Sequence, residues 1–187
     1  MKLVALNMSN KLHLGNGNVY LKNYINVDLV GKADLYDDVV TLRKLTGQYK
    51  EIIACMVLEH LGKFKYKQAL KRWYELLEEN GKLRITVPDF EAICKYYLET
   101  KDLNSLYSAL YAGQNQPYNF HYWCWDFETL KRDLEEIGFK NIKRTQPNKV
   151  RDWSTNYVPY HDSKGNELPD KEWFKGTNIA LNVEASK

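Results

Sequence analysis

Small and acidic residues follow three successive short apolar segments near the start of the chain. Gly15–Gly17 follows Lys11–Leu14, and glycine lets the backbone approach a ligand closely and adopt positive φ. Asp28 ends the second segment and Asp38 follows the third. A carboxylate at such a strand end can accept the ribose hydroxyls of a bound nucleoside or the exocyclic amine of adenine. The pattern favours a nucleoside site, with a structural glycine turn and capping or solvated acids as the alternative.

A dinucleotide fingerprint is incomplete in this chain. Its third glycine would fall at Tyr20, and only six residues, 18–23, separate the first two predicted strands. Because a crossover helix needs about ten residues or more, this connection is either a truncated crossover or a hairpin. NAD and FAD are therefore disfavoured as ligands.

Histidine is the natural proton acceptor near neutral pH, and two of the four histidines are candidates for that role. His60 follows the fourth apolar strand in Leu58–His60, and His121 lies in an aromatic, loop-like segment, Tyr118–Trp125. A structural role stays open for each. Asp89 ends a strand and is either a base or substrate ligand or simply a helix N-cap.

Aromatic residues gather in segments 118–125 and 153–160, interleaved with Asn, His and Asp. Buried rings often fill core space, but glycine and proline in these segments make a packed core a poor explanation. Tyr118, Tyr122 and Trp123 are candidate substrate contacts. Such a platform suits the apolar face of a sugar, and equally a flipped base or a phenolic ring.

The elements that position these residues alternate between strand and helix, which predicts an α/β sheet with right-handed parallel crossovers. Residues 65–80 carry the clearest helical period and Gly81 is placed to end that helix. The predicted strands are 11–14, 24–29, 33–36, 51–56, 82–87, 139–144 and 178–184, and the other predicted helices are 39–45, 90–98, 102–111 and 127–137. We expect one domain over residues 1–187, with an aromatic-rich insertion at about 145–177.

Composition excludes several classes of protein. The chain has 187 residues and a formal net charge of +3, without a run of like charges, so a nucleic-acid partner is not predicted. No apolar run approaches the roughly 18 to 20 residues of a membrane span. Cys55, Cys94 and Cys124 form no CxxC pair, and residues 1–7 lack the apolar core of a secretory signal. We expect a cytoplasmic protein.

Five segments in order resemble class I S-adenosylmethionine-dependent methyltransferases. More narrowly, they are similar to the small bacterial and viral group often found with glycan biosynthesis genes. The resemblance covers about residues 11–144, and residues 178–185 fit the last strand of that group. It is carried by Leu12–Gly17, Tyr24–Asp28, Ala54–His60, Gly81–Asp89 and Leu134–Phe139.

The resemblance implies a role for each strand end. Gly15 and Gly17 would pass beneath the methionine part of the cofactor and Asp28 would hold its ribose. Asp38 with its neighbour Val39 would meet the adenine.

The same resemblance places the Cys55–Met56 backbone along the cofactor near its sulfonium. Asn16, between the two glycines, departs from the small or sulfur-bearing residue common there. The implied fold is a Rossmann-like sheet, mostly parallel with an antiparallel last strand, helices on both faces and a shortened first crossover.

The predicted function is an S-adenosylmethionine-dependent O-methyltransferase acting on a sugar or glycan intermediate. Methyl transfer is an in-line displacement, so the protein must align the acceptor and take the proton of a hydroxyl, for which His121 is the first candidate and His60 the second. No metal is predicted, because no carboxylate and histidine set stands at ligand spacing. The alternatives are transfer to another small molecule or a protein side chain, and a non-catalytic cofactor-binding module.

Overall fold

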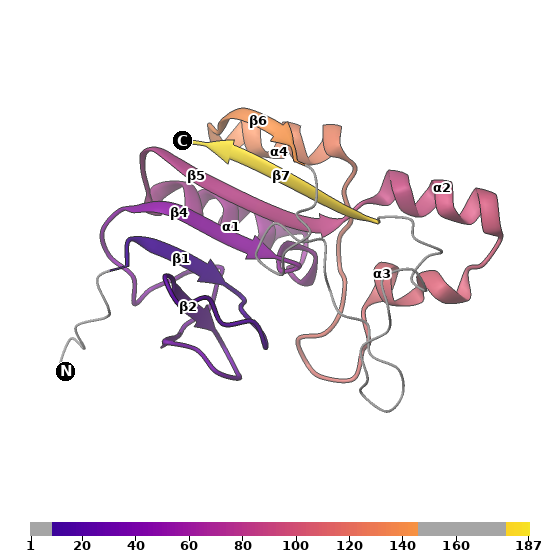
Figure 1. The fold of residues 1–187 in the computed structure, drawn as a ribbon, viewed down its shortest axis with the longest axis horizontal. Helices are drawn as coiled ribbons and strands as arrows, with labels where there is room; N and C mark the ends of the chain where they lie inside the picture. The colour runs from indigo at the N-terminus through magenta and orange to yellow at the C-terminus, as the bar shows by residue number, and fades with distance from the viewer. Residues whose placement is uncertain (1–8, 146–178) are drawn as a thin grey trace.

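Seven strands form one sheet in the computed structural model, which describes residues 9–145 and 179–187 (Figure 1). The order is β3-β2-β1-β4-β5-β7-β6. Strands β1 to β5 pair in parallel, and β7 runs antiparallel to both β5 and β6. The strands are β1 Lys11–Leu14, β2 Ile25–Asp28, β3 Leu35–Tyr36, β4 Tyr49–Cys55, β5 Leu77–Pro88, β6 Lys140–Arg144 and β7 Ala180–Ser186. The predicted sheet, with its antiparallel last strand, is confirmed.

The first connection is a truncated crossover rather than a hairpin, because Leu12 pairs with Ile25 and Leu14 with Val27 in parallel register. The side chain of Asn26, which is fully buried, holds this short loop together. Its amide donates to the carbonyls of Leu21 and Tyr24, and its oxygen accepts from the Leu21 N–H. One buried amide thus satisfies backbone groups that a crossover helix would otherwise pair internally.

One face of the sheet is apolar and carries the main core. Residues at alternate positions of five strands, from Leu12 to Ala185, are buried in a single cluster with residues of α1 (Lys63–Leu76) and α4 (Phe127–Ile137). These two helices also bond each other, since Tyr66 and Lys67 of α1 contact Asp133 and Glu136 of α4. Helix α1 and helix α4 therefore share this face.

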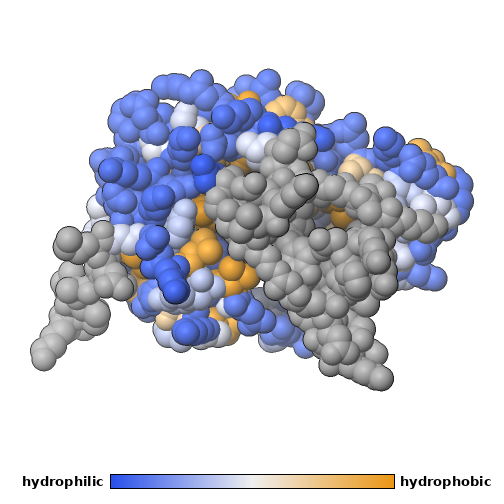
Figure 2. Space-filling view, viewed as in Figure 1, coloured by the Kyte–Doolittle hydropathy of each residue, from blue (hydrophilic) through white to orange (hydrophobic). Residues whose placement is uncertain are grey.

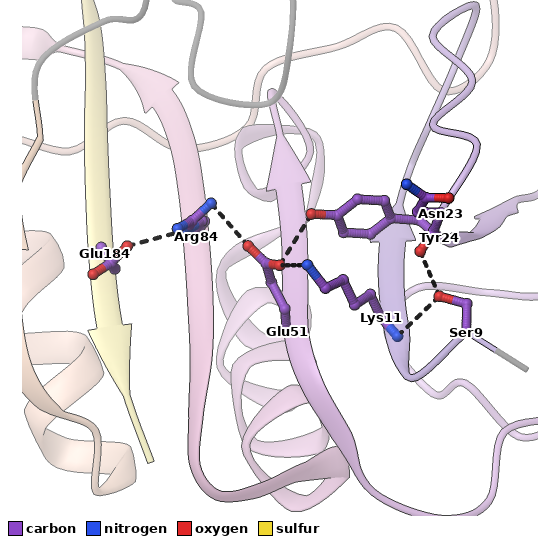
Figure 3. Close-up of polar contacts among 7 residues, drawn as sticks. All are labelled: Ser9, Lys11, Asn23, Tyr24, Glu51, Arg84 and Glu184. Carbon is purple, nitrogen blue, oxygen red and sulfur yellow. Dashed lines mark hydrogen bonds and ion pairs between the residues drawn. The ribbon is translucent and has the colours of Figure 1, made fainter.

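The opposite face is polar, as Figure 3 shows. Glu51 on β4 forms ion pairs with Lys11 at 2.8 Å and Arg84 at 2.8 Å and accepts from the Tyr24 hydroxyl at 3.0 Å. Arg84 also pairs with Glu184 at 3.1 Å. Parallel sheets covered by helices on both faces carry apolar residues on both. Among the described residues of this second face, ion pairs between strands stand where a covered sheet would carry apolar side chains.

Two expected elements differ from the structure. Residues 39–45 form turns instead of a helix, because side chains of α1 take up their carbonyls: Arg72 bonds three of them, and Trp73 Nε1 donates to Val39 at 2.8 Å. Helix α1 ends at Leu76 and Leu77 already pairs with Tyr49 of β4, so Gly81 lies inside β5 and does not end the helix.

The remaining helices lie beyond the carboxyl end of β5 (Figure 1). Helix α2, Phe90–Thr100, begins at its predicted N-cap Asp89, and a 3-10 turn, Asn104–Leu106, leads into α3, Tyr107–Tyr111. A second small core cluster joins α2 to this turn and α3. Helix α4 has its predicted bounds, from the N-cap Asp126 to Gly138 at φ +117°.

Two general observations complete the fold. No helix among the described residues is long and apolar enough to cross a membrane. The face seen in Figure 2 is mainly hydrophilic, with apolar surface near its centre. Apart from Thr145, the predicted aromatic-rich insertion at 145–177 lies outside the described residues.

Candidate active site

The glycine turn after β1 packs against the segment that follows β4. Gly15 has φ +60°, and its N–H donates to the Val27 carbonyl at 2.8 Å. A Cβ at this position would lie 2.5 Å from Cγ2 of Val57. Both the left-handed backbone and this close approach require glycine, so the sequence signal at Gly15 has a direct structural cause.

Gly17 and Asp28 form the open side of the same turn. Gly17 has φ +51°, and no atom lies within 4 Å of where its Cβ would be. Its N–H donates to Oδ2 of Asp28 at 2.8 Å, while Oδ1 accepts from the N–H groups of Leu29 at 2.7 Å and Val30 at 3.2 Å. A carboxylate has about four acceptor sites, so Asp28 retains capacity for a further donor.

Asn16 holds the turn from inside. Its side chain is buried, and its amide donates to the carbonyls of Gly17 at 3.1 Å and Lys32 at 3.0 Å. The departure from the family pattern at this position therefore has a structural use: an amide spans the turn and the loop before β3.

Asp38 and Val39 lie after β3 with part of their bonding capacity already used. Oδ1 of Asp38 accepts from the Val40 N–H at 2.8 Å, which makes Asp38 a turn cap. Val39 is buried in the core and its carbonyl accepts from Trp73. The predicted adenine contact must therefore involve the second oxygen of Asp38 or the Val39 N–H.

Cys55 and Met56 lead from β4 toward the site. Burial raises the pKa of the Cys55 thiol to about 12, so it stays protonated and is no nucleophile near neutral pH. Met56 has φ +52°, and its N–H donates to the Thr86 carbonyl at 2.8 Å. A left-handed conformation is uncommon for methionine, and such outliers gather at functional sites.

Three side chains, Glu59, His60 and His121, meet at the carboxyl end of β4. Glu59 and His60 belong to a 3-10 turn, Leu58–His60, whereas His121 comes from the loop before α4. His121 Nε2 lies 4.0 Å from Oε1 of Glu59, and the two imidazole rings lie edge to face with centroids 4.7 Å apart. The structure thus brings together both histidines that the sequence singled out.

Backbone carbonyls orient both rings. Nδ1 of His121 lies 2.8 Å from the Ala109 oxygen and Nδ1 of His60 lies 3.1 Å from the Phe120 oxygen. Since a carbonyl only accepts, Nδ1 of His121 carries the hydrogen, and its Nε2, which faces Glu59, keeps the lone pair.

Burial controls the charge of all three groups. It raises the pKa of Glu59 to about 8, lowers that of His121 to about 4 and also lowers the pKa of His60. Glu59 is fully buried, and neither of its carboxyl oxygens has a hydrogen-bond partner. The sequence pattern predicts no role for Glu59, which falls within the segment Leu58–His60. Its position next to His60 at a strand end was the signal that could have found it.

The predicted aromatic contacts divide into two kinds. Tyr118 and Tyr122 are 63% and 59% exposed, and the Tyr122 N–H donates to the Glu59 carbonyl at 2.8 Å. Trp123 instead stacks on Tyr66 with ring centroids 5.6 Å apart, against the main core. The two tyrosines are therefore free to contact a ligand, and Trp123 is largely used in packing.

Asp89 is also engaged within the protein. Its carboxylate accepts from the Ala92 N–H at 3.4 Å as the N-cap of α2, and Arg144 lies 3.4 Å from its other oxygen. The residue is buried. These contacts account for Asp89 without a substrate.

Solved structures of methyltransferases share this fold. An S-adenosylmethionine-dependent methyltransferase from Archaeoglobus fulgidus superposes with a TM-score of 0.59 at 16% identity, over 97% of this chain and 87% of that one. A structure titled as a possible histamine N-methyltransferase from Thermotoga maritima gives 0.59 and 16%, over 95% and 81%. Human N-acetylserotonin methyltransferase, solved with S-adenosylmethionine, gives 0.54 and 12%, over 95% and 47%. The chain has the class I methyltransferase fold. No protein-family model and no curated protein sequence matches it.

On this methyltransferase fold the candidate residues form two groups. The first is the glycine turn with Asp28, and the second is the cluster Glu59–His60–His121. Val57 joins them, because it contacts Gly15 and lies two residues before Glu59 in the chain. Both groups lie at carboxyl ends of parallel strands, where open α/β sheets bind ligands.

Proposed function

We propose that the chain is an S-adenosylmethionine-dependent methyltransferase. The cofactor would lie over Gly15–Gly17, and the acceptor would meet His60 and His121. The observation that carries this proposal is the contact of Val57 with Gly15, which sets the histidine cluster beside the glycine turn. When bound, the cofactor supplies a methyl group on a sulfonium, and the protein's task is alignment.

The residues around the turn fit a nucleoside cofactor. Gly17 leaves open space on the side where its Cβ would point, and Asp28 keeps acceptor capacity for a ribose hydroxyl. Val19, Leu29 and Val30 expose apolar side chains around the same turn. An acidic acceptor beside apolar surface is the combination that a ribose and an adenine ring require.

The histidine cluster fits a hydroxyl acceptor. Nε2 of His121 has a lone pair and can accept the hydrogen bond of an acceptor hydroxyl, whose proton leaves as its oxygen is methylated. His60 lies edge-on to that ring and limits where the hydroxyl can sit. We assign His121 the direct contact and His60 the supporting one.

A sugar or glycan intermediate is the acceptor class we propose. Tyr118 and Tyr122 expose their rings on the loop that carries His121, and exposed tyrosines can stack on the apolar face of a sugar while their hydroxyls bond to it. A phenol or a protein side chain is the alternative acceptor, and a cofactor-binding module without transfer is the alternative role.

The three unpaired cysteines support a reducing, cytoplasmic setting.

Calorimetry and a labelled-methyl assay test this proposal in turn. Wild type should bind S-adenosylmethionine, and Asp28→Ala should lower that affinity at least about tenfold, because it removes the only acidic acceptor proposed at the turn. Glu128→Gln, an exposed acid on α4, is the matched control. Absence of cofactor binding by wild type would refute the assignment.

The acceptor is tested by supplying labelled cofactor with sugar nucleotides, phenols or proteins. His121→Ala should spare cofactor affinity and reduce transfer. Transfer only to non-sugars would overturn the sugar assignment, and cofactor binding without transfer to any acceptor would favour the non-catalytic module.

A further inference from the structure

Glu59 is a buried carboxyl group without a protein partner. Its side chain is fully buried, both oxygens lack hydrogen bonds, and among the described residues no lysine or arginine pairs with it. Leaving such a group unpaired destabilises the folded state, because the carboxyl loses its hydrogen bonds to water and gains none from the protein. The fold therefore contains a buried acidic group that no hydrogen bond from the described residues stabilises.

The histidines beside it are arranged as metal-binding histidines usually are. Nδ1 of His121 donates to the Ala109 carbonyl, which fixes the tautomer with Nε2 unprotonated toward Glu59. Carbonyls of the aromatic loop, Phe120 and Tyr118, hold the His60 ring. Metal-ligating histidines typically carry such a bond from the nitrogen that does not coordinate, because it orients the ring and raises its basicity.

The loop that brings His121 to Glu59 is fastened independently of any ligand. The Tyr122 N–H donates to the Glu59 carbonyl at 2.8 Å, and the His121 N–H lies 3.4 Å from the Tyr111 carbonyl. Residues sixty positions apart in the chain are thus fixed side by side. Sequence spacing alone could not reveal this set, which is why no metal was predicted.

We infer that Glu59, His60 and His121 together bind one divalent transition-metal cation of the Zn²⁺ type. One ligand atom from each side chain lies within 4.8 Å of the others. Tetrahedral bonds of about 2.0–2.1 Å place ligand atoms about 3.4 Å apart, so the 4.0 Å between His121 and Glu59 must shorten by about half an ångström and any separation near the 4.8 Å limit by about 1.4 Å. The Glu59 carboxyl can make this shift because no hydrogen bond anchors it.

The donor set selects the class of cation. Two imidazole nitrogens and one carboxylate suit zinc and similar transition metals, whereas Mg²⁺ and Ca²⁺ prefer oxygen ligands. Three protein ligands leave a further coordination position open, as in catalytic zinc sites. In a role that rests on the proposed function, that position would take the acceptor hydroxyl and favour loss of its proton, and with the metal bound this contact would replace the direct one between the hydroxyl and Nε2 of His121.

Equilibrium dialysis against Zn²⁺ alone, followed by elemental analysis, tests the site without cofactor or acceptor. The exposed thiols Cys94 and Cys124 bind zinc adventitiously, so the reference protein is C94S/C124S. We expect about one zinc per chain, and at least about a tenfold loss of affinity in E59Q and in H121N on the same background. E128Q, an exposed acid on α4, should bind as the reference does.

Co²⁺ provides the second measurement, since its visible absorption reports the ligand set directly. A spectrum of a four- or five-coordinate nitrogen–oxygen site that E59Q and H121N both abolish supports the inference. Zinc content equal in the reference and E59Q, with both folded by circular dichroism, overturns it, as does binding that survives H121N. If E59Q fails to fold, H121N alone decides, because the His121 side chain is partly exposed whereas that of Glu59 is fully buried. Loss of cofactor binding, measured separately, would refute the proposed function and leave this result unaffected.

Discussion

Asp28 and Glu59 are both carboxylic acids that lie at the carboxyl ends of parallel strands, β2 and β4, on either side of β1, yet their surroundings are opposite. Asp28 is half-buried and accepts three backbone N–H groups, whereas Glu59 is fully buried and accepts none. The turn around Asp28 is thus satisfied by the protein itself, with acceptor capacity left for the ribose that we propose there. The Glu59 cluster is left unsatisfied by the protein, so its completion must come from a ligand.

Gly15→Ala should cause the largest loss of stability at the satisfied turn, about 2–4 kcal/mol of unfolding free energy, because a methyl group meets both a left-handed backbone and Val57 at 2.5 Å. Gly17→Ala has a similar φ but open space, so it should lose only about 1–2 kcal/mol. Urea denaturation compares the two variants.

A second substitution isolates the contact with Val57. Adding Val57→Ala to Gly15→Ala should recover part of the lost stability, since it removes the two methyl groups nearest the new Cβ. Equal losses for the two glycine variants would show that backbone conformation alone makes these positions glycine.

The pH dependence of stability probes the unsatisfied cluster. Burial raises the pKa of Glu59 from 4.5 to about 8, so between these values the unfolded chain releases a proton that the folded chain keeps. Above pH 6.5, where the neighbouring histidines are neutral in both the folded and the unfolded chain, the folding stability of the metal-free protein should therefore fall as the pH rises toward 8, with a slope approaching about 1.4 kcal/mol per pH unit. Below pH 6.5 the lowered pKa values of His121 and His60 act in the opposite direction. Glu59→Gln should flatten the profile, and urea unfolding in the presence of a chelator measures it. Parallel profiles would mean that Glu59 is paired.

Asp28→Asn tests how much the negative charge of Asp28 contributes to cofactor affinity. The amide keeps one oxygen for the backbone donors but loses the negative charge, so we expect about a tenfold lower affinity for S-adenosylmethionine, equivalent to about 1.4 kcal/mol. Calorimetry measures it. Glu59→Gln should leave this affinity within about twofold. An equal loss in both variants would mean that the two regions act as one site.

The sequence predicted those helix and strand ends that depend on residues close together in the chain. Helix α4 has its predicted bounds because Asp126 accepts from the Thr129 N–H at one end and Gly138 adopts φ +117° at the other. Likewise, the glycine turn and Asp28 end neighbouring strands only eleven residues apart, close enough for strand order alone to join them.

What sequence reasoning missed depends on contacts between distant residues. Segment 39–45 looks helical, but Arg72 and Trp73, some thirty residues on, bond its carbonyls and keep it in turns. Glu59 gained no role because its partner His121 arrives from a loop sixty residues later. Neither of these long-range contacts can be predicted from the periodicity of apolar residues or from residue spacing.

Tyr122→Ala should give the smallest effect of all. Its ring is 59% exposed, so stability should change by no more than about 0.5 kcal/mol, while the KM for a sugar acceptor rises several-fold through loss of about 1 kcal/mol of stacking. Trp123→Ala, one residue on, is the contrasting variant: its ring packs on Tyr66, so its loss should be mainly of stability, about 3 kcal/mol. Kinetics and urea unfolding on both variants separate the ligand-facing side of this loop from its core-facing side. An unchanged KM in Tyr122→Ala would remove this tyrosine from the proposed acceptor site and leave Tyr118 and the Glu59–His60–His121 cluster as the features of the described residues proposed to select an acceptor.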